Sequence, residues 1–193
     1  MPTDRYPWYI IVAGRDSLEQ GDLLDDYPIA ALPYEIAEVT FSRDQRDIET
    51  KIDIDSFNVI IMTQSCDFQK LKDDDEVILC YRMSYPEVLK VKKEFATQDG
   101  WSKLRKGHFI GLHLLNACTV KGYSFRHQIV DLQRVFTSPL KIVKRMAEKC
   151  TKRVRLCPPY REHLAQSFAR QFMRVGLPLD LPDKSPYYLP NTK

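Results

Sequence analysis

Two short apolar segments constrain the fold of this chain more than any other feature. Residues 57–64 read FNVIIMTQ and residues 77–83 read VILCYRM. Apolar runs of this length are typical of strands that are buried on both faces of a sheet. Between them, KLKDDDE (70–76) contains four consecutive acids, which cannot be buried without partners. The pattern therefore predicts a β-hairpin with a solvated connection.

Further strands are predicted on both sides of this hairpin. WYIIVA (8–13) is rich in aromatic and β-branched residues, and YEIAEVTFS (34–42) alternates like a half-exposed strand. After the hairpin, GHFIGLHLL (107–115) and YSFRHQIVDLQRVF (123–136) again have strand character. Strands joined by short connections favour antiparallel pairing.

A helix is predicted as an insertion at residues 84–98. Ser84 and Glu87 have the spacing of a capping box, and Pro86 suits the first turn of a helix. The dipeptide DG that follows at 99–100 is expected to end this helix.

The final third of the chain is predicted to be helical over 138–178. Its clearest helix, PPYREHLAQSFARQFMRVGLP (158–178), has an apolar half, and a proline-rich tail follows at 179–193. We therefore expect a single α+β domain over 1–193. Residues 1–136 would form a small, mostly antiparallel, barrel-like β core with the inserted helix, and two C-terminal helices would pack on it.

Composition limits the kinds of site that this chain can carry. Its five cysteines are odd in number and have no C-x-x-C spacing, which favours reduced thiols in a cytoplasmic protein over a disulfide framework. Its four histidines lack the spacing of a metal site, and no motif predicts a cofactor. No segment approaches the ~20 apolar residues of a membrane span, and the N-terminus does not resemble a signal peptide.

Charge is divided unevenly along the chain. Residues 1–79 contain 18 acids and 7 bases, whereas residues 80–193 contain 8 acids and 22 bases. Two interpretations stay open: the two parts neutralise each other within one fold, or the basic part forms a face for nucleic acid or for an acidic protein partner.

The basic residues are densest at 141–174, where ten bases accompany only Glu148 and Glu162. If they line two helices, they can form a stripe that binds phosphates or an acidic protein. The predicted contact residues are Lys141, Lys144, Arg145, Lys152, Arg153, Arg155, Arg170 and Arg174.

The candidates for catalysis are Cys66, Asp67 and His113. A nucleophilic thiol needs a nearby base, and His113 lies on a predicted strand that could pair close to Cys66. Adjacent acids oppose this role, because negative charge raises the pKa of a thiol. A structural role is therefore favoured for Cys66, and a structural ion pair is predicted to join Asp67 to Arg126 or Arg161.

Residues 15–85 contain QGDL (20–23) followed, after a charged loop, by VIIMTQS (59–65) and the hairpin. This order resembles the PemK/MazF family, small SH3-like barrels best known as toxin endoribonucleases. In that family a Gly-Asp-aliphatic segment precedes a strand that runs into a loop containing Ser or Thr. The resemblance implies an SH3-like barrel in a bacterial toxin–antitoxin or phage-defence assembly.

One departure from the family concerns catalysis. The family usually carries an arginine, commonly followed by proline, ahead of the second strand, where it stabilises charge at the scissile phosphate. This chain has Asp53 and Asp55 in that region, so loss of ribonuclease activity is expected.

The leading hypothesis is a non-catalytic protein-interaction module that docks a partner through the basic helices or the tail. One alternative is a nucleic-acid-binding protein or MazF-like endoribonuclease that uses the basic half. The other is a cysteine-dependent hydrolase that uses Cys66. The sequence does not predict an oligomeric state.

Overall fold

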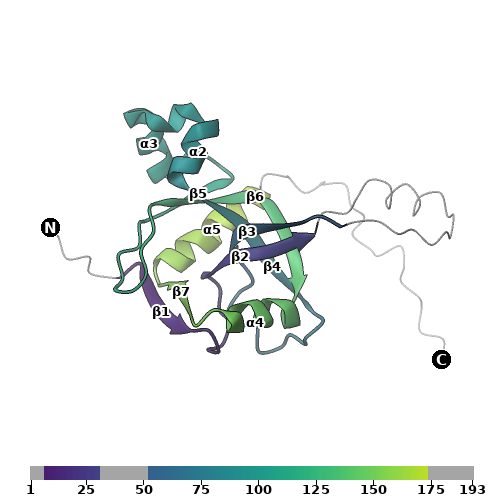
Figure 1. Cartoon of the computed structure of the whole chain (residues 1–193). Helices are drawn as coiled ribbons and strands as arrows, with labels where there is room; N and C mark the ends of the chain where they lie inside the picture. Colours follow the sequence, from purple (N-terminus) through teal and green to yellow (C-terminus); the bar gives the residue numbers. More distant parts are fainter. Residues whose placement is uncertain (1–6, 31–51, 174–193) are drawn as a thin grey trace, which may run out of the picture.

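The computed structural model describes residues 7–30 and 52–173, which form an α+β fold (Figure 1). Seven antiparallel strands form one sheet in the order β1-β7-β2-β3-β4-β6-β5. β1 and β5 are its edges and do not pair with each other, so the sheet is open in this part of the chain. The α+β class and the antiparallel sheet are confirmed, whereas a barrel-like, SH3-like closure is not.

The strands and helices have the following bounds. The strands are β1 Tyr9–Ala13, β2 Asp22–Ala30, β3 Ile54–Ile61, β4 Glu76–Ser84, β5 Leu112–Leu115, β6 Gln128–Pro139 and β7 Lys152–Leu156. The helices are α2 Tyr85–Val91, the 3₁₀ helix η1 Lys93–Ala96, α3 Gln98–Arg105, α4 Leu140–Lys149 and α5 Tyr160–Phe172. None of these helices is both long and apolar enough to cross a membrane.

The central hairpin is buried on both faces, as its apolar runs predict. β3 pairs with β4, and side chains along β3 alternate between two cores. Val59 and Ile61 pack in the core that α4 covers, whereas Ile60 packs in the core that contains Leu164 of α5. In Figure 1, α4 and α5 accordingly lie against different parts of the sheet. The strand predicted at 34–42 lies outside the described residues.

The predicted insertion is helical but longer than expected. The capping box of Ser84 and Glu87 is present at the start of α2. The helix end predicted at 99–100 is not observed, because Gly100 lies inside α3. A Cβ at this position would clash with the backbone oxygen of Glu94, so the glycine is required by a close backbone approach rather than by a helix end.

The two helices predicted within 138–178 are present as α4 and α5, but the segment between them forms a strand, β7, which was not predicted. This strand lies between α4 and α5 in the chain and is inserted in the sheet between β1 and β2. Its sequence, KRVRL, reads as polar, yet four of its five residues are buried. The partners of its arginines explain how these charges are accommodated inside the protein.

Candidate functional site

Two arginines of β7 are buried in an ion-pair network with the N-terminal part of the chain. Arg153 is 1% exposed, and its Nε donates to Asp22 at 2.9 Å. Its Nη atoms donate four bonds of 2.7–2.8 Å, to the backbone oxygens of Ala13, Gly14, Asp16 and Ser17. All five N–H groups of this guanidinium therefore have acceptors.

Arg155 completes this network. Its Nη2 donates to Asp22 at 3.0 Å, and its Nη1 donates to Glu19. Hydrogen bonding to Asp22 and the charges of Asp22 and Glu19 raise the pKa of Arg155 despite the opposing effect of burial. The prediction that Arg153 and Arg155 belong to an exposed contact surface is wrong. Both are buried, and both form ion pairs with acids of the first half of the chain.

The ion pair predicted for Arg161 forms with a different acceptor. Its Nη1 donates to Glu19 Oε2 at 2.8 Å. Asp67 and the exposed Arg126 have no ion-pair partner within residues 7–30 and 52–173. The predicted pairing of Asp67 with Arg126 or Arg161 is therefore wrong.

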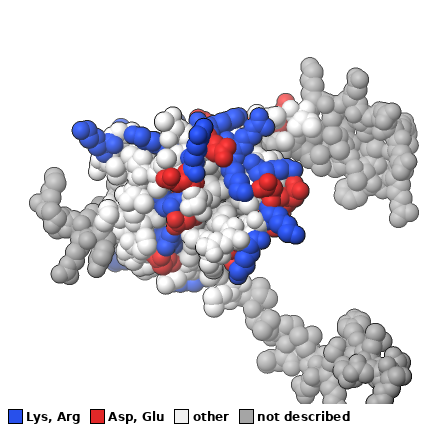
Figure 2. Space-filling view, turned by 90° about the horizontal axis from the view of Figure 1, so that it is seen from below, with Lys and Arg blue, Asp and Glu red and all other residues white. Residues whose placement is uncertain are grey.

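Two lysines of α4 also bind acids of the first half. Lys144 Nζ lies 2.8 Å from Asp73, and Lys141 Nζ lies 2.5 Å from Asp74. All four side chains are exposed. Figure 2, which views the molecule from below Figure 1, shows Lys and Arg atoms interspersed with Asp and Glu atoms on this side. The basic and acidic parts of the sequence thus neutralise each other here.

The remaining predicted contact residues do not gather in one place. Arg145 on α4 and Lys152 on β7 are exposed and have no acidic partner in the described ranges. Arg170 lies near the end of α5 and lines a groove described below. Arg174 lies outside the described residues.

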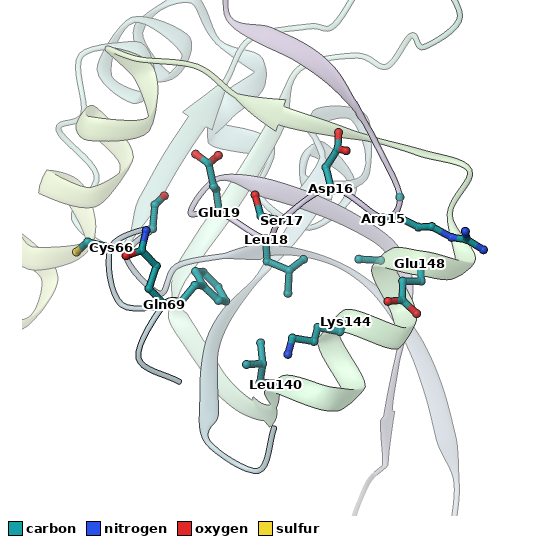
Figure 3. Close-up of a pocket in the computed structure, with 14 residues that line it drawn as sticks. Arg15, Asp16, Ser17, Leu18, Glu19, Cys66, Gln69, Leu140, Lys144 and Glu148 are labelled. Carbon is teal, nitrogen blue, oxygen red and sulfur yellow. The ribbon is translucent and has the colours of Figure 1, made fainter. Parts of the chain in front are cut away.

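Cys66 lies on the β3–β4 connection, at the edge of a cavity of about 540 Å³. The cavity has apolar side chains from Leu18, Phe68 and Leu140 and a rim that includes Lys144. In Figure 3 the sulfur of Cys66 points away from the other labelled side chains. Its hydrogen-bond partners are Gln64 and Asp67, and neither is the imidazole that usually activates a nucleophilic thiol.

His113 does not accompany Cys66. Its Nδ1 lies 3.0 Å from Ser167 Oγ on α5, and it lines cavities to which Cys66 does not contribute. Desolvation by burial, followed by the nearby His163, lowers the pKa of His113 to about 4. This imidazole is therefore neutral at pH 7 and is held in place by α5. Cys66 and Asp67 are neighbours, but the structure does not bring His113 to them.

A groove lies between α3 and α5, at the β5 edge of the sheet, and is formed by two adjoining cavities. The aromatic cavity, of about 380 Å³, is lined by Trp8, Trp101, Arg105, His113, Leu114, Asn116, His127, Tyr160 and His163. The basic cavity, of about 260 Å³, shares four of these residues and is further lined by Leu104, Lys106, Gly107, Leu112, Gln166, Ser167 and Arg170. We refer to the two together as the α3–α5 groove.

Two pairs of rings contribute to the aromatic cavity. Trp8 and Tyr160 stack with centroids 3.7 Å apart and planes 11° apart. Trp101 meets His127 edge to face, with centroids 5.1 Å apart. The first pair joins the residue before β1 to the start of α5, whereas the second joins α3 to the residue before β6.

The charges of the groove are all of one sign. Arg105 and Lys106 at the end of α3 and Arg170 near the end of α5 are exposed. No aspartate or glutamate lines either cavity, and none forms an ion pair with these three cations within the described ranges. The cations of this groove thus remain available to a ligand, unlike Lys141, Lys144, Arg153 and Arg155.

The histidines of the groove do not form a metal site. Across residues 7–30 and 52–173, no group of three or more His, Cys, Asp or Glu side chains is arranged to hold a metal ion. The groove therefore presents its imidazoles as hydrogen-bonding groups rather than as a metal-ligand set.

A third cavity, of about 350 Å³, surrounds Arg82 on β4. The guanidinium is buried and donates to Asp25, to Gln128 and to the backbone oxygen of Val59. Asp25 also accepts a bond of 3.3 Å from the Tyr123 hydroxyl. The buried charge is thus compensated inside the protein, which favours a structural role for this cluster.

No known family model matches this chain, and a search of curated proteins finds no relative. The resemblance to the PemK/MazF family stays a prediction that depends on short motifs. In the structure, Asp22 of the first motif is the buried acceptor for Arg153 and Arg155, and VIIMTQS ends β3 and enters the loop that contains Cys66.

Proposed function

We propose that this protein binds nucleic acid through the α3–α5 groove. The observation that carries the proposal is the combination of three exposed cations with three aromatic rings and three imidazoles in one groove that no carboxylate lines. Phosphates bind to such cations by charge and hydrogen bonding, and nucleobases stack on aromatic rings. Nucleic-acid binding is one of the alternatives predicted from the sequence, where it depends on the basic half of the chain. The binding surface proposed here is instead the α3–α5 groove.

The pairing of charges elsewhere supports this choice. Of the contact residues predicted for a protein partner, Lys141, Lys144, Arg153 and Arg155 already bind acids of the same chain. Arg105 and Arg170 bind none in the described residues. A negative ligand that approaches α3 and α5 therefore meets cations that are not already paired with acids of the described residues.

The proposal is binding rather than cleavage. Cys66 lies outside the groove and has no basic partner among the described residues, which argues against a cysteine-dependent hydrolase. The region where the PemK/MazF family carries its arginine has Asp53 and Asp55 instead. A toxin–antitoxin or phage-defence setting and an SH3-like ancestry remain part of this proposal and depend on the resemblance alone.

Fluorescence anisotropy of a labelled single-stranded oligonucleotide tests this function. The protein should bind at low salt, and log K should fall with log salt by about 0.7 for each phosphate contact. Replacing both Arg105 and Arg170 by alanine should weaken binding and flatten this slope by about 1.4.

Arg145→Ala is the matched control. Arg145 is also an exposed helical arginine, but it lies on α4, away from the groove. Its replacement should leave the affinity unchanged. Binding that is lost in Arg145→Ala and kept in the Arg105→Ala, Arg170→Ala variant would instead support the basic surface predicted from the sequence. The absence of binding at low salt would exclude the proposed function.

A further inference from the structure

We infer that the aromatic cavity is a subsite for one unpaired nucleobase, while the cations of the basic cavity hold the adjoining phosphates. This inference rests on the proposed function, because it assigns separate roles to the two parts of the α3–α5 groove. It names the substrate class as single-stranded nucleic acid. A ligand that offers phosphates alone would use only half of the groove.

The first argument is the distribution of side chains between the two cavities. All the large aromatic rings, Trp8, Trp101 and Tyr160, line the aromatic cavity, whereas Lys106 and Arg170 line only the basic cavity. Arg105 lines both and so lies at their junction. A nucleotide has the same division, with a flat ring at one end and a charged group at the other.

The second argument is that the rings are fixed before any ligand arrives. Trp8 is stacked on Tyr160, and Trp101 is held edge to face by both His127 and Tyr85, each at a centroid distance of 5.1 Å. Rings that are already positioned lose little conformational entropy when a base stacks on them. In proteins that bind single-stranded nucleic acid, each stacked base adds to the affinity, and it does so whichever base it is.

The third argument is the polar lining. Asn116 contributes an amide whose Oδ1 accepts from the backbone of Ala117 and whose Nδ2 donates to no acceptor among the described residues. His113 and His127 add ring nitrogens. Uncharged donors and acceptors of this kind bind the edges of a base that has left its stack.

The size of the cavity excludes paired bases. A volume of about 380 Å³ lies near the lower limit of the ~300–1,000 Å³ that small-ligand sites occupy. A base within a duplex is stacked on both faces and cannot enter such a site unless it is unpaired and extruded. Duplex should therefore compete only through its phosphates.

Intrinsic fluorescence offers a direct readout, because the chain has two tryptophans and both line this cavity. The probe is an oligonucleotide of about 10 deoxythymidines, within the site sizes of single-strand-binding folds. The comparison is an abasic oligonucleotide with the same number of phosphates. The intact probe should quench the tryptophan emission and bind about tenfold more tightly than the abasic probe.

The outcomes separate the subsite from the function as a whole. Equal affinity for the two probes, with unchanged tryptophan emission, would overturn the base subsite but leave nucleic-acid binding intact. No binding of either probe at low salt would overturn both.

A pair of variants gives a second readout. Trp101→Ala should lower the affinity for the intact probe about tenfold and leave the affinity for the abasic probe unchanged. Phe172→Ala is the control, because Phe172 is 59% exposed on α5 and does not line the groove. Equal effects of Trp101→Ala on both probes would contradict the inference.

Discussion

Asp22 at the start of β2 and Arg153 on β7 form an ion pair that solvent does not reach. The two residues are 131 positions apart in the sequence, their atoms are 2.9 Å apart, and their side chains are 0% and 1% exposed. The pair fixes β7 in the sheet next to β2 and connects it, through Arg153, to the backbone of the β1–β2 loop. It also removes one of the basic residues late in the chain from the surface.

Replacing Arg153 by methionine should destabilise the fold severely. The substitution leaves the carboxylate of Asp22 buried with fewer partners and removes four hydrogen bonds to the end of β1 and the β1–β2 loop. Breaking a buried pair in this way costs about 3–5 kcal/mol, which urea-induced unfolding measures directly.

Lys152→Met is the matched control for that prediction. Lys152 is the exposed neighbour of Arg153 on the same strand, so its replacement should change the free energy of unfolding by less than about 0.5 kcal/mol. Similar losses in the two variants would show that the charge of β7, rather than the buried pair, stabilises the fold.

The ion pair between Lys144 and Asp73 should contribute little to stability. Both side chains are well exposed, and water screens such pairs. The midpoint of urea unfolding should be the same for Lys144→Ala as for the wild-type protein, both at low and at high salt. A clear loss at low salt that disappears at high salt would contradict this expectation.

Stability should depend on pH through His113. Its pKa in the folded protein is lowered to about 4 from 6.5, so the unfolded chain binds this proton more readily. The contribution is fully present above pH 6.5 and is lost as the pH falls towards 4, by up to about 3 kcal/mol. Unfolding of the wild-type protein and of His113→Asn at pH 7 and pH 4.5 measures the difference. An identical loss of stability in both proteins would assign the pH dependence to other groups.

Cys66 should react with thiol reagents without affecting binding. It is exposed, whereas Cys80, Cys118 and Cys157 are buried, and burial raises the pKa of Cys80 to about 12. Mass spectrometry after brief treatment with iodoacetamide should find Cys66 modified well before these three. Because Cys66 lies outside the α3–α5 groove, the modified protein should bind the oligonucleotide as before. Loss of binding on modification would connect the Cys66 cavity to function.

The parts of the fold that were predictable from the sequence have strong local signals. The hairpin of β3 and β4 follows from two continuous apolar runs, and α2 begins at the capping box of Ser84. Each signal lies within a few residues and does not depend on the rest of the chain. The expected end of the inserted helix was wrong because Gly100 is required by a contact with Glu94, and a local rule cannot distinguish this from a helix stop.

The features that were not predictable from the sequence, β7 and the α3–α5 groove, depend on contacts between segments that are distant in the chain. β7 reads as polar because its arginines are neutralised by Asp22 and Glu19, far away in the chain. The α3–α5 groove collects Trp8, Trp101 and Tyr160 from three separate segments, none of which has a recognisable binding motif. Of the predicted contact residues that the structure describes, only Arg170 lines this groove. Counting charges along the sequence identifies the basic segment. It cannot show which of those cations form ion pairs with acids of the same chain.

The most direct test of nucleic-acid binding in the groove is a ¹⁵N–¹H correlation spectrum of the protein titrated with a single-stranded oligonucleotide. The indole N–H groups of Trp8 and Trp101 give two resolved signals, which Trp101→Phe assigns. If the groove is the binding site, both signals shift and saturate together with the anisotropy change. If the oligonucleotide binds while both indole signals stay unchanged, binding takes place elsewhere and this account of the groove is wrong.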